Sequence, residues 1–274
     1  MRIYGVDFTS APRRAKPITV ASASLKDSEL HLEEVERLET FGEFETLLAR
    51  PGPWVGGFDF PFSLPSELVR DLGWPPAWKT LVRHCASMSR REFREALDAY
   101  RNTRPIGRRY AHRATDLPAG SSSPMKLVNP PVALMFHEGA ARLAASGVHV
   151  PALFEGDSKR VALEAYPGLL ARKQLGIRES YKSDTRSEQT PARAAARRQI
   201  VQALKEGLPL GIKLKTKADL VADASGDTLD AAICAVQAAW AAGRPRYGFP
   251  ARVPPSEGWI ITADQLLGST GTSS

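Results

Sequence analysis

Strands that end on a carboxylate are the feature that most constrains the fold of this chain. Asp7 follows a β-branched and aromatic run, Asp59 stands near the end of a mostly apolar run, and Glu164 belongs to a third. Residues at the carboxyl ends of parallel strands face a common crevice, where open α/β sheets place their sites. One acidic residue in such a position is more often a turn former, but three of them favour a shared site.

The runs around these carboxylates predict a mixed α/β domain. Turn-rich segments separate the first three strands, which favours an antiparallel meander over residues 3–6, 18–23 and 30–35. Further strands are predicted at 54–60, whose near-continuous apolarity suits a strand covered on both faces, and at 161–165.

Helices are predicted between and after these strands. Thr40 and Glu43 form a capping box at the start of a helix over residues 40–50. The other predicted helices cover residues 89–100, 131–146, 191–205, 218–222 and 227–242, and residues 259–262 are expected to add an edge strand or a packing clasp. We expect one domain over residues 1–267, with a helical insertion at about 63–158 and a disordered tail at 268–274.

Two further carboxylates, Asp227 and Asp230, stand three residues apart at the start of the last helix, which places them on one face. They could serve only as an N-cap and a first-turn anion. The small residues after them, among them Ala231 and Ala235, allow this helix to pack closely on a sheet. A role in the crevice is therefore the alternative for both aspartates.

Several carboxylates in one crevice repel one another unless cations bind them. A set of oxygen ligands indicates magnesium or manganese rather than zinc. Two such ions about 3.5–4 Å apart activate a water and stabilise the leaving oxygen in phosphodiester hydrolysis. This chemistry requires a polyanionic substrate.

The net charge of +7 favours such a partner. Residues 101–113 contain five arginines, among which Arg104, Arg108 and Arg109 are candidates for binding phosphate, together with Lys182. A solvated basic loop is the alternative interpretation of the arginine segment.

Other classes of protein are disfavoured. Cys85 and Cys234 lie far apart and outside any Cys/His cluster, which argues against a disulfide framework and a structural zinc site. No run approaches the roughly 20 apolar residues of a membrane span, and the N-terminus lacks a signal-peptide pattern. We expect a cytoplasmic protein without a membrane partner.

The ordered motifs resemble a known family. They are Gly5-Val6-Asp7, the segment from Phe58 to Pro65, Glu164-Ala165-Tyr166-Pro167, Tyr181-Lys182-Ser183-Asp184, Asp227-Thr228-Leu229-Asp230 and Glu257-Gly258-Trp259-Ile260. Together they look like the family called domain of unknown function 429, described as predicted nucleases. The resemblance implies a ribonuclease H-like mixed five-stranded sheet, with three antiparallel strands followed by parallel ones, flanked by helices. It also implies metal-binding carboxylates on the first strand, the fourth strand and the last helix.

The leading hypothesis is a nuclease or related phosphodiesterase that depends on magnesium or manganese. Asp7, Asp59 and Asp230 would bind the metal, Asp227 and Glu164 would assist, and Arg104, Arg108, Arg109 and Lys182 would hold the phosphate backbone of a nucleic acid. The first alternative is a non-catalytic nucleic-acid-binding or protein-interaction module on the same fold. A magnesium-nucleotide phosphotransferase ranks third.

Overall fold

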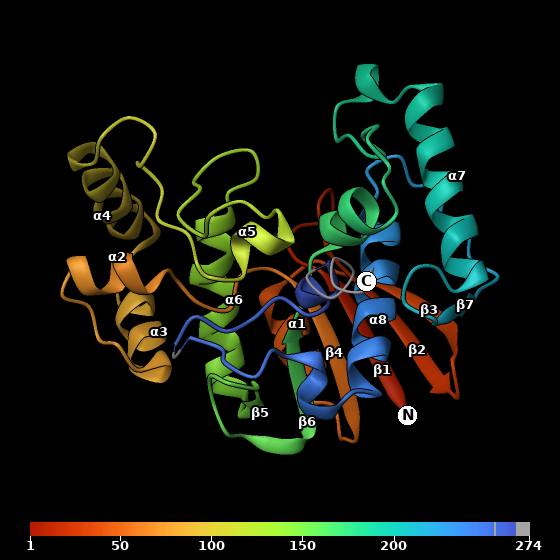
Figure 1. Ribbon diagram of the computed structural model, residues 1–274, viewed down its shortest axis with the longest axis horizontal. Coiled ribbons are helices and arrows are strands. Elements are labelled where there is room, and N and C mark those ends of the chain that lie inside the picture. The colour runs from red at the N-terminus through yellow and green to blue at the C-terminus, as the bar shows by residue number, and fades with distance from the viewer. Residues whose placement is uncertain (255, 267–274) are drawn as a thin grey trace, which may run out of the picture.

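A mixed sheet with helices on both faces runs through the protein in the computed structural model, which describes residues 1–254 and 256–266 (Figure 1). Its first three strands form the expected antiparallel meander, and two further strands lie parallel to the first on its other side. These five strands are β1 (Arg2–Asp7), β2 (Ile18–Lys26), β3 (Glu29–Leu38), β4 (Trp54–Asp59) and β6 (Asp157–Glu164). The predicted tail at 268–274 lies outside the described residues.

The number of strands differs from the expected five. Within the described residues the sheet has seven strands in the order β5-β6-β4-β1-β2-β3-β7. The additional strands β5 (Val148–His149) and β7 (Lys213–Lys215) lie at the two edges. Strands of two and three residues are too short to show the alternation by which a strand is recognised in a sequence.

The α-helices are α1 (Phe41–Leu48), α2 (Ser66–Asp71), α3 (Trp78–Ala86), α4 (Arg90–Thr103), α5 (Asp116–Ala119), α6 (Val132–Ser146), α7 (Pro191–Glu206) and α8 (Asp227–Ala242). A π-helix, η1 (Leu169–Gln174), and three short 3-10 helices, η2 (Arg186–Glu188), η3 (Pro245–Gly248) and η4 (Ala263–Leu266), complete the described elements. Helices α2 to α6 all lie between β4 and β6 in the chain.

One predicted helix takes another form, and the segment at 259–262 takes one of the two forms expected of it. The helix predicted at 218–222 is wrong, because the Asp219 carboxylate accepts hydrogen bonds from the backbone N–H groups of Val221 and Ala222 and holds a turn instead. The segment at 259–262 forms a clasp: Ile260 makes one parallel bridge to Glu164, and Ile261 N–H donates to the Glu164 carbonyl at 2.9 Å.

Each face of the sheet has its own apolar core. On β1, Tyr4 and Val6 face the core shared with α1 and the inserted helices, whereas Ile3 faces the core shared with α7 and α8. Side chains alternate along a strand, so Asp7, like Ile3, points to the α8 side.

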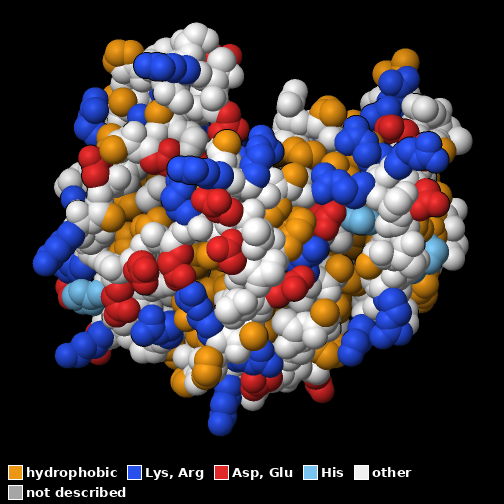
Figure 2. Space-filling model, turned by 180° about the vertical axis from the view of Figure 1, so that it is seen from behind, with side chains coloured by type: hydrophobic (Ala, Val, Ile, Leu, Met, Phe, Trp, Pro, Cys, Tyr) orange, Lys and Arg blue, Asp and Glu red, His pale blue; other side chains and the backbone are white. Residues whose placement is uncertain are grey.

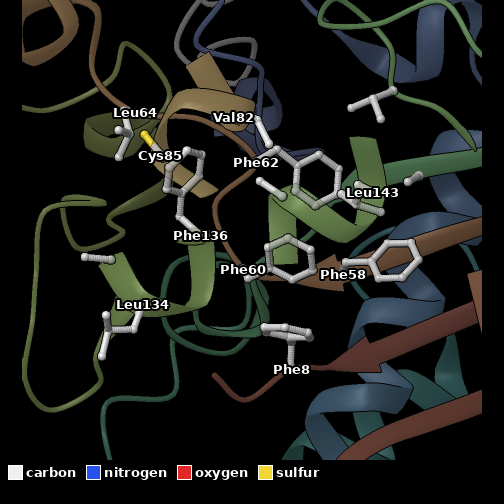
Figure 3. Close-up of a cluster of buried hydrophobic side chains, with 14 of the residues drawn as sticks. Phe8, Phe58, Phe60, Phe62, Leu64, Val82, Cys85, Leu134, Phe136 and Leu143 are labelled. Carbon is white, nitrogen blue, oxygen red and sulfur yellow. The ribbon is translucent and has the colours of Figure 1, made fainter. Parts of the chain in front are cut away.

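Aromatic rings connect the sheet to the inserted helices (Figure 3). Phe8 follows β1 directly, and its ring lies 4.5 Å from that of Phe60 between centroids. Phe60 and Phe62 follow β4 and are 5.1 Å apart. All three rings are buried, so the backbone immediately after Asp7 and Asp59 is held by packing.

Cys85 and Cys234 are both buried and free. Among the described helices, none is both long enough and apolar enough to cross a membrane.

Candidate metal centre and its cleft

Three aspartates from three elements meet on the α8 side of the sheet. Asp7 and Asp59 end the parallel neighbours β1 and β4 and face each other in register. Asp230 lies in the first turn of α8. One carboxylate oxygen from each of the three lies within 4.8 Å of the others.

A pair of glycines brings α8 close enough to complete this cluster. Gly5 and Gly57 are register partners, each two residues before an aspartate of the cluster, and both face α8. A Cβ on Gly5 would lie 2.0 Å from the Ala231 carbonyl oxygen, and one on Gly57 would lie 2.5 Å from the Cys234 carbonyl oxygen. The helix backbone therefore rests directly on the strand backbone, which only glycine permits at this distance.

Burial and mutual repulsion perturb the two strand aspartates. Burial, followed by the charge of Asp230, raises the pKa of Asp7 well above its usual range, although Lys182 opposes the shift. Burial also raises the pKa of Asp59 to about 7, against the attraction of Lys182. Two carboxyls that resist ionisation beside a third carboxylate are typical of a site built to receive positive charge.

Two lysines balance the aspartates of α8. Lys182 donates a hydrogen bond to Asp230, which is fully buried and also accepts one from the Tyr181 hydroxyl at 2.6 Å. Lys16, from the segment after β1, donates to Asp227 at 2.8 Å and to Asp184 at 2.9 Å. Burial alone would lower the pKa of Lys182, but Asp230 and its neighbours raise it well above the usual range. Both lysines are therefore held as cations.

Glu164 lies in a separate buried network. Both of its carboxylate oxygens accept from the Arg113 guanidinium at 2.7 Å, and one also accepts from the Phe62 N–H at 3.0 Å. Asp116 holds the same guanidinium at 2.8 Å. Burial raises the pKa of Glu164, whereas Arg113 lowers it and limits the shift. This network ties the insertion to the end of β6.

The comparisons with known proteins agree with the family resemblance. Residues 5–254 match the family model described as "Protein of unknown function (DUF429)". The chain belongs to this family. Searches among curated proteins and among solved structures find no match.

The aspartates of this DUF429 protein open into a cleft of about 850 Å³. Asp7, Asp59 and Asp227 line its floor, and Glu164 reaches it as well. One wall comes from the inserted segment at 121–135, and the other from the segment at 166–193. The basic residues along the walls are Lys126, Arg172, Arg178, Lys182 and Arg193.

The predicted phosphate-binding residues divide between two places. Lys182 lines the cleft. Arg104 makes an ion pair with Glu67 at 2.8 Å, and Arg108 and Arg109 are exposed on the segment after α4, which projects on the side away from α7 (Figure 1). Seen from behind, the surface is indented between two projecting lobes that both carry Lys and Arg side chains (Figure 2). The structure therefore does not bring the three arginines to the aspartates.

The donor set of the cluster fits magnesium or manganese. Its donors are carboxylate oxygens, the hard ligands that these ions prefer. Asp7, Asp59 and Asp230 would hold such an ion, and Asp227, at the start of the same helix turn as Asp230, lines the cleft beside them.

Sequence reasoning missed several residues of this cleft. Lys16 lies in a turn-rich segment without any motif, and Lys126 is a lone lysine in a Pro- and Ser-rich stretch. Tyr181 and Tyr166 stand inside motifs that we recognised, beside a lysine and a glutamate to which we gave roles. Their position in these motifs was the signal that could have identified Tyr166 and Tyr181 as residues of the cleft.

Proposed function

We propose that this protein is a metal-dependent phosphodiesterase that acts on nucleic acid. The observation that carries the proposal is the cluster of Asp7, Asp59 and Asp230, which each contribute a carboxylate oxygen within 4.8 Å of the others; Asp7 and Asp59 line a basic-walled cleft, and Asp230 is buried beside them. Carboxylates gathered this closely are costly to bury unless cations compensate them.

The arrangement of the longer strands supports a ribonuclease H-like fold. Without the two short edge strands, the order is β6-β4-β1-β2-β3, with an antiparallel meander followed by parallel strands. The three aspartates stand on the first strand, the fourth strand and the last long helix. These are the positions that the family resemblance implies for metal ligands.

The chain's own residues would divide the work of hydrolysis. Magnesium or manganese would supply an activated water and stabilise the leaving oxygen. Asp7, Asp59 and Asp230 would hold the cation, and Tyr181 fixes the Asp230 carboxylate through its hydroxyl. Lys182, held as a cation beside this cluster, would attract the substrate phosphate. The walls would exclude much of the bulk water.

The proposal is tested by cleavage of labelled single-stranded, duplex, branched and hybrid nucleic acids with magnesium or manganese. Asp7→Asn should abolish cleavage, because it removes one of the three ligands. Asp184→Asn is the matched control: its side chain is 69% exposed and pairs with Lys16 outside the cluster, so cleavage should persist. Absence of cleavage of every substrate, or full activity in Asp7→Asn, would sink the assignment.

The lysines favour one alternative, a module that binds nucleic acid without turnover. Lys182 and Lys16 each neutralise one α8 aspartate, so part of the acidic charge is balanced by the chain itself. This alternative predicts binding that weakens steeply with salt and does not respond to chelators. Calorimetric titration of manganese into the wild type and Asp59→Asn separates the two, because only the enzyme requires a divalent site that Asp59→Asn loses.

A further inference from the structure

We infer that the cleft receives a flexible single strand of nucleic acid rather than a duplex, with Tyr166 as a stacking surface beside the carboxylates. This inference rests on the proposed function and specifies its substrate class. It follows from the burial of the aspartates, from the spacing of the cleft walls, and from the aromatic and basic residues that line these walls.

The aspartates lie too deep for a rigid double helix. Asp7 is 9% exposed and Asp230 is fully buried. The cleft volume of about 850 Å³ is within the range of roughly 300–1,000 Å³ that is typical of pockets for small ligands. A duplex carries its phosphates on the outside of a broad cylinder, whereas a single strand can bend one phosphate down to the floor.

A lysine bridge links the two sides of the cleft. Lys173, on η1, donates to the carbonyl oxygens of Leu117 and Pro118 on α5 at 3.0 and 2.9 Å. This exposed contact joins the segment that follows β6 to the inserted segment just before the wall at 121–135. It favours the observed spacing of the two sides over a wider one.

Tyr166 is placed to stack on a base. It lines the cleft, packs on its other side against a small apolar cluster that includes Trp259 and Ile260, and is half-buried. Its hydroxyl accepts from Arg172, whose guanidinium carbon lies 5.8 Å from the ring centroid and thus near the hydroxyl edge. Gly168 leaves room for this pair, since a Cβ there would lie 2.7 Å from the Tyr166 hydroxyl.

The wall cations suit a phosphate backbone. Lys126 on the inserted wall and Arg178 on the opposite wall line the cleft, and within the described residues neither makes an ion pair with an acidic side chain. Cations on both sides of a groove together with an aromatic surface in it are the pattern of single-strand binding, in which stacking contributes about 1–3 kcal/mol per base.

The test is a binding measurement in the Asp7→Asn background, where hydrolysis is suppressed. Fluorescence anisotropy compares a labelled single-stranded decamer, the same decamer in a blunt duplex, and a decamer of abasic sites. The single strand should bind at least about tenfold more tightly than the duplex. Adding Tyr166→Ala should weaken single-strand binding about 5- to 160-fold and leave binding of the abasic decamer unchanged. Tyr166→Leu should have the same effect. Tyr166→Phe should retain binding.

Lys126→Ala should reduce the slope of log affinity against log salt by about 0.7, the value for one phosphate contact on a single strand. Arg83→Ala, exposed on α3 and outside the cleft, is the control and should change nothing. Melting temperatures verify that each variant folds.

Equal or tighter binding of the duplex, or unchanged single-strand affinity in both Tyr166→Ala and Tyr166→Leu, would overturn the inference. Hydrolysis of the small chromogenic ester bis(p-nitrophenyl) phosphate by the wild type with manganese separates the two proposals. If the wild type hydrolyses the ester but the binding measurement shows no preference for the single strand, only this inference is refuted. If neither binding nor hydrolysis occurs, both fall.

Discussion

Gly5→Ala tests whether close packing of α8 creates the aspartate cluster. The new Cβ would lie 2.0 Å from the Ala231 carbonyl oxygen and 2.3 Å from the Ala235 nitrogen. Ordinary contact begins at 3.4 Å, so the helix must retreat by about 1.4 Å and carry Asp230 away from Asp7. Overpacking of a rigid core costs about 1–3 kcal/mol and sometimes more; because both clashing groups are backbone, we expect about 3 kcal/mol.

Thermal unfolding and manganese calorimetry measure the two consequences. For a chain of this size, a loss of 3 kcal/mol lowers the Tm by about 6–12 °C, and the manganese affinity should fall at least tenfold. Gly42→Ala is the matched control: Gly42 is exposed on α1, and its nearest neighbour would be 3.9 Å away. It should be neutral or stabilise by up to about 1 kcal/mol. A Gly5→Ala protein with wild-type Tm and manganese affinity would refute the packing argument.

Three other perturbations test the electrostatics. Because the pKa of Asp59 is raised from 3.8 to about 7, its protonated form favours folding; this contribution of at most roughly 4 kcal/mol is present below pH 3.8 and is lost as the pH rises through 7. Manganese should therefore raise the Tm more at pH 8 than at pH 5, and an equal increment at both would contradict the assignment. Glu164→Gln leaves the buried Arg113 with Asp116 as its remaining acidic partner and should cost about 3–5 kcal/mol, whereas Glu164→Met, Arg113→Met and Asp116→Asn made together remove all three charges and should cost less; a triple variant as unstable as the single one would contradict a charge effect. Tyr181→Phe removes a hydrogen bond to buried Asp230 and should cost about 1.5–3 kcal/mol in urea unfolding, while a neutral result would mean that the hydroxyl does not orient the carboxylate.

The strand ends could be predicted because they depend on local pattern. The apolar runs before Asp7 and Asp59 can be recognised as strands, and parallel pairing brings the carboxyl ends of neighbouring strands together. Gly5 and Gly57, which let α8 approach and complete the aspartate cluster, are equally visible in the sequence. A sequence does not show, however, that two glycines will be register partners beneath one helix. The short edge strands β5 and β7 carry no period and could not be predicted.

The cations illustrate a different limit. Arginines are dense between residues 101 and 113, but density does not determine which acidic groups will be near. Arg104 meets Glu67 and Asp71, more than thirty positions earlier in the chain, and Arg113 is buried against Glu164. The wall residue Lys126, in contrast, has no other basic residue near it in the sequence. Charge patterning therefore predicted a basic protein and, apart from Lys182, left the basic residues of its cleft walls unassigned.

The charges at the cleft floor lead to a specific expectation about cation number. Four aspartates lie there or beside it, and the two on α8, Asp227 and Asp230, are each paired with a lysine. The two without a lysine bond are Asp7 and Asp59, and these are the carboxyls whose pKa is raised. When both are ionised, the residual charge of these four aspartates and two lysines is −2, which one divalent cation balances; Asp184, which shares Lys16, is 69% exposed, so water screens its charge. The lysines therefore need not leave for a cation to bind, and a second cation would have to be compensated by the substrate's own phosphates.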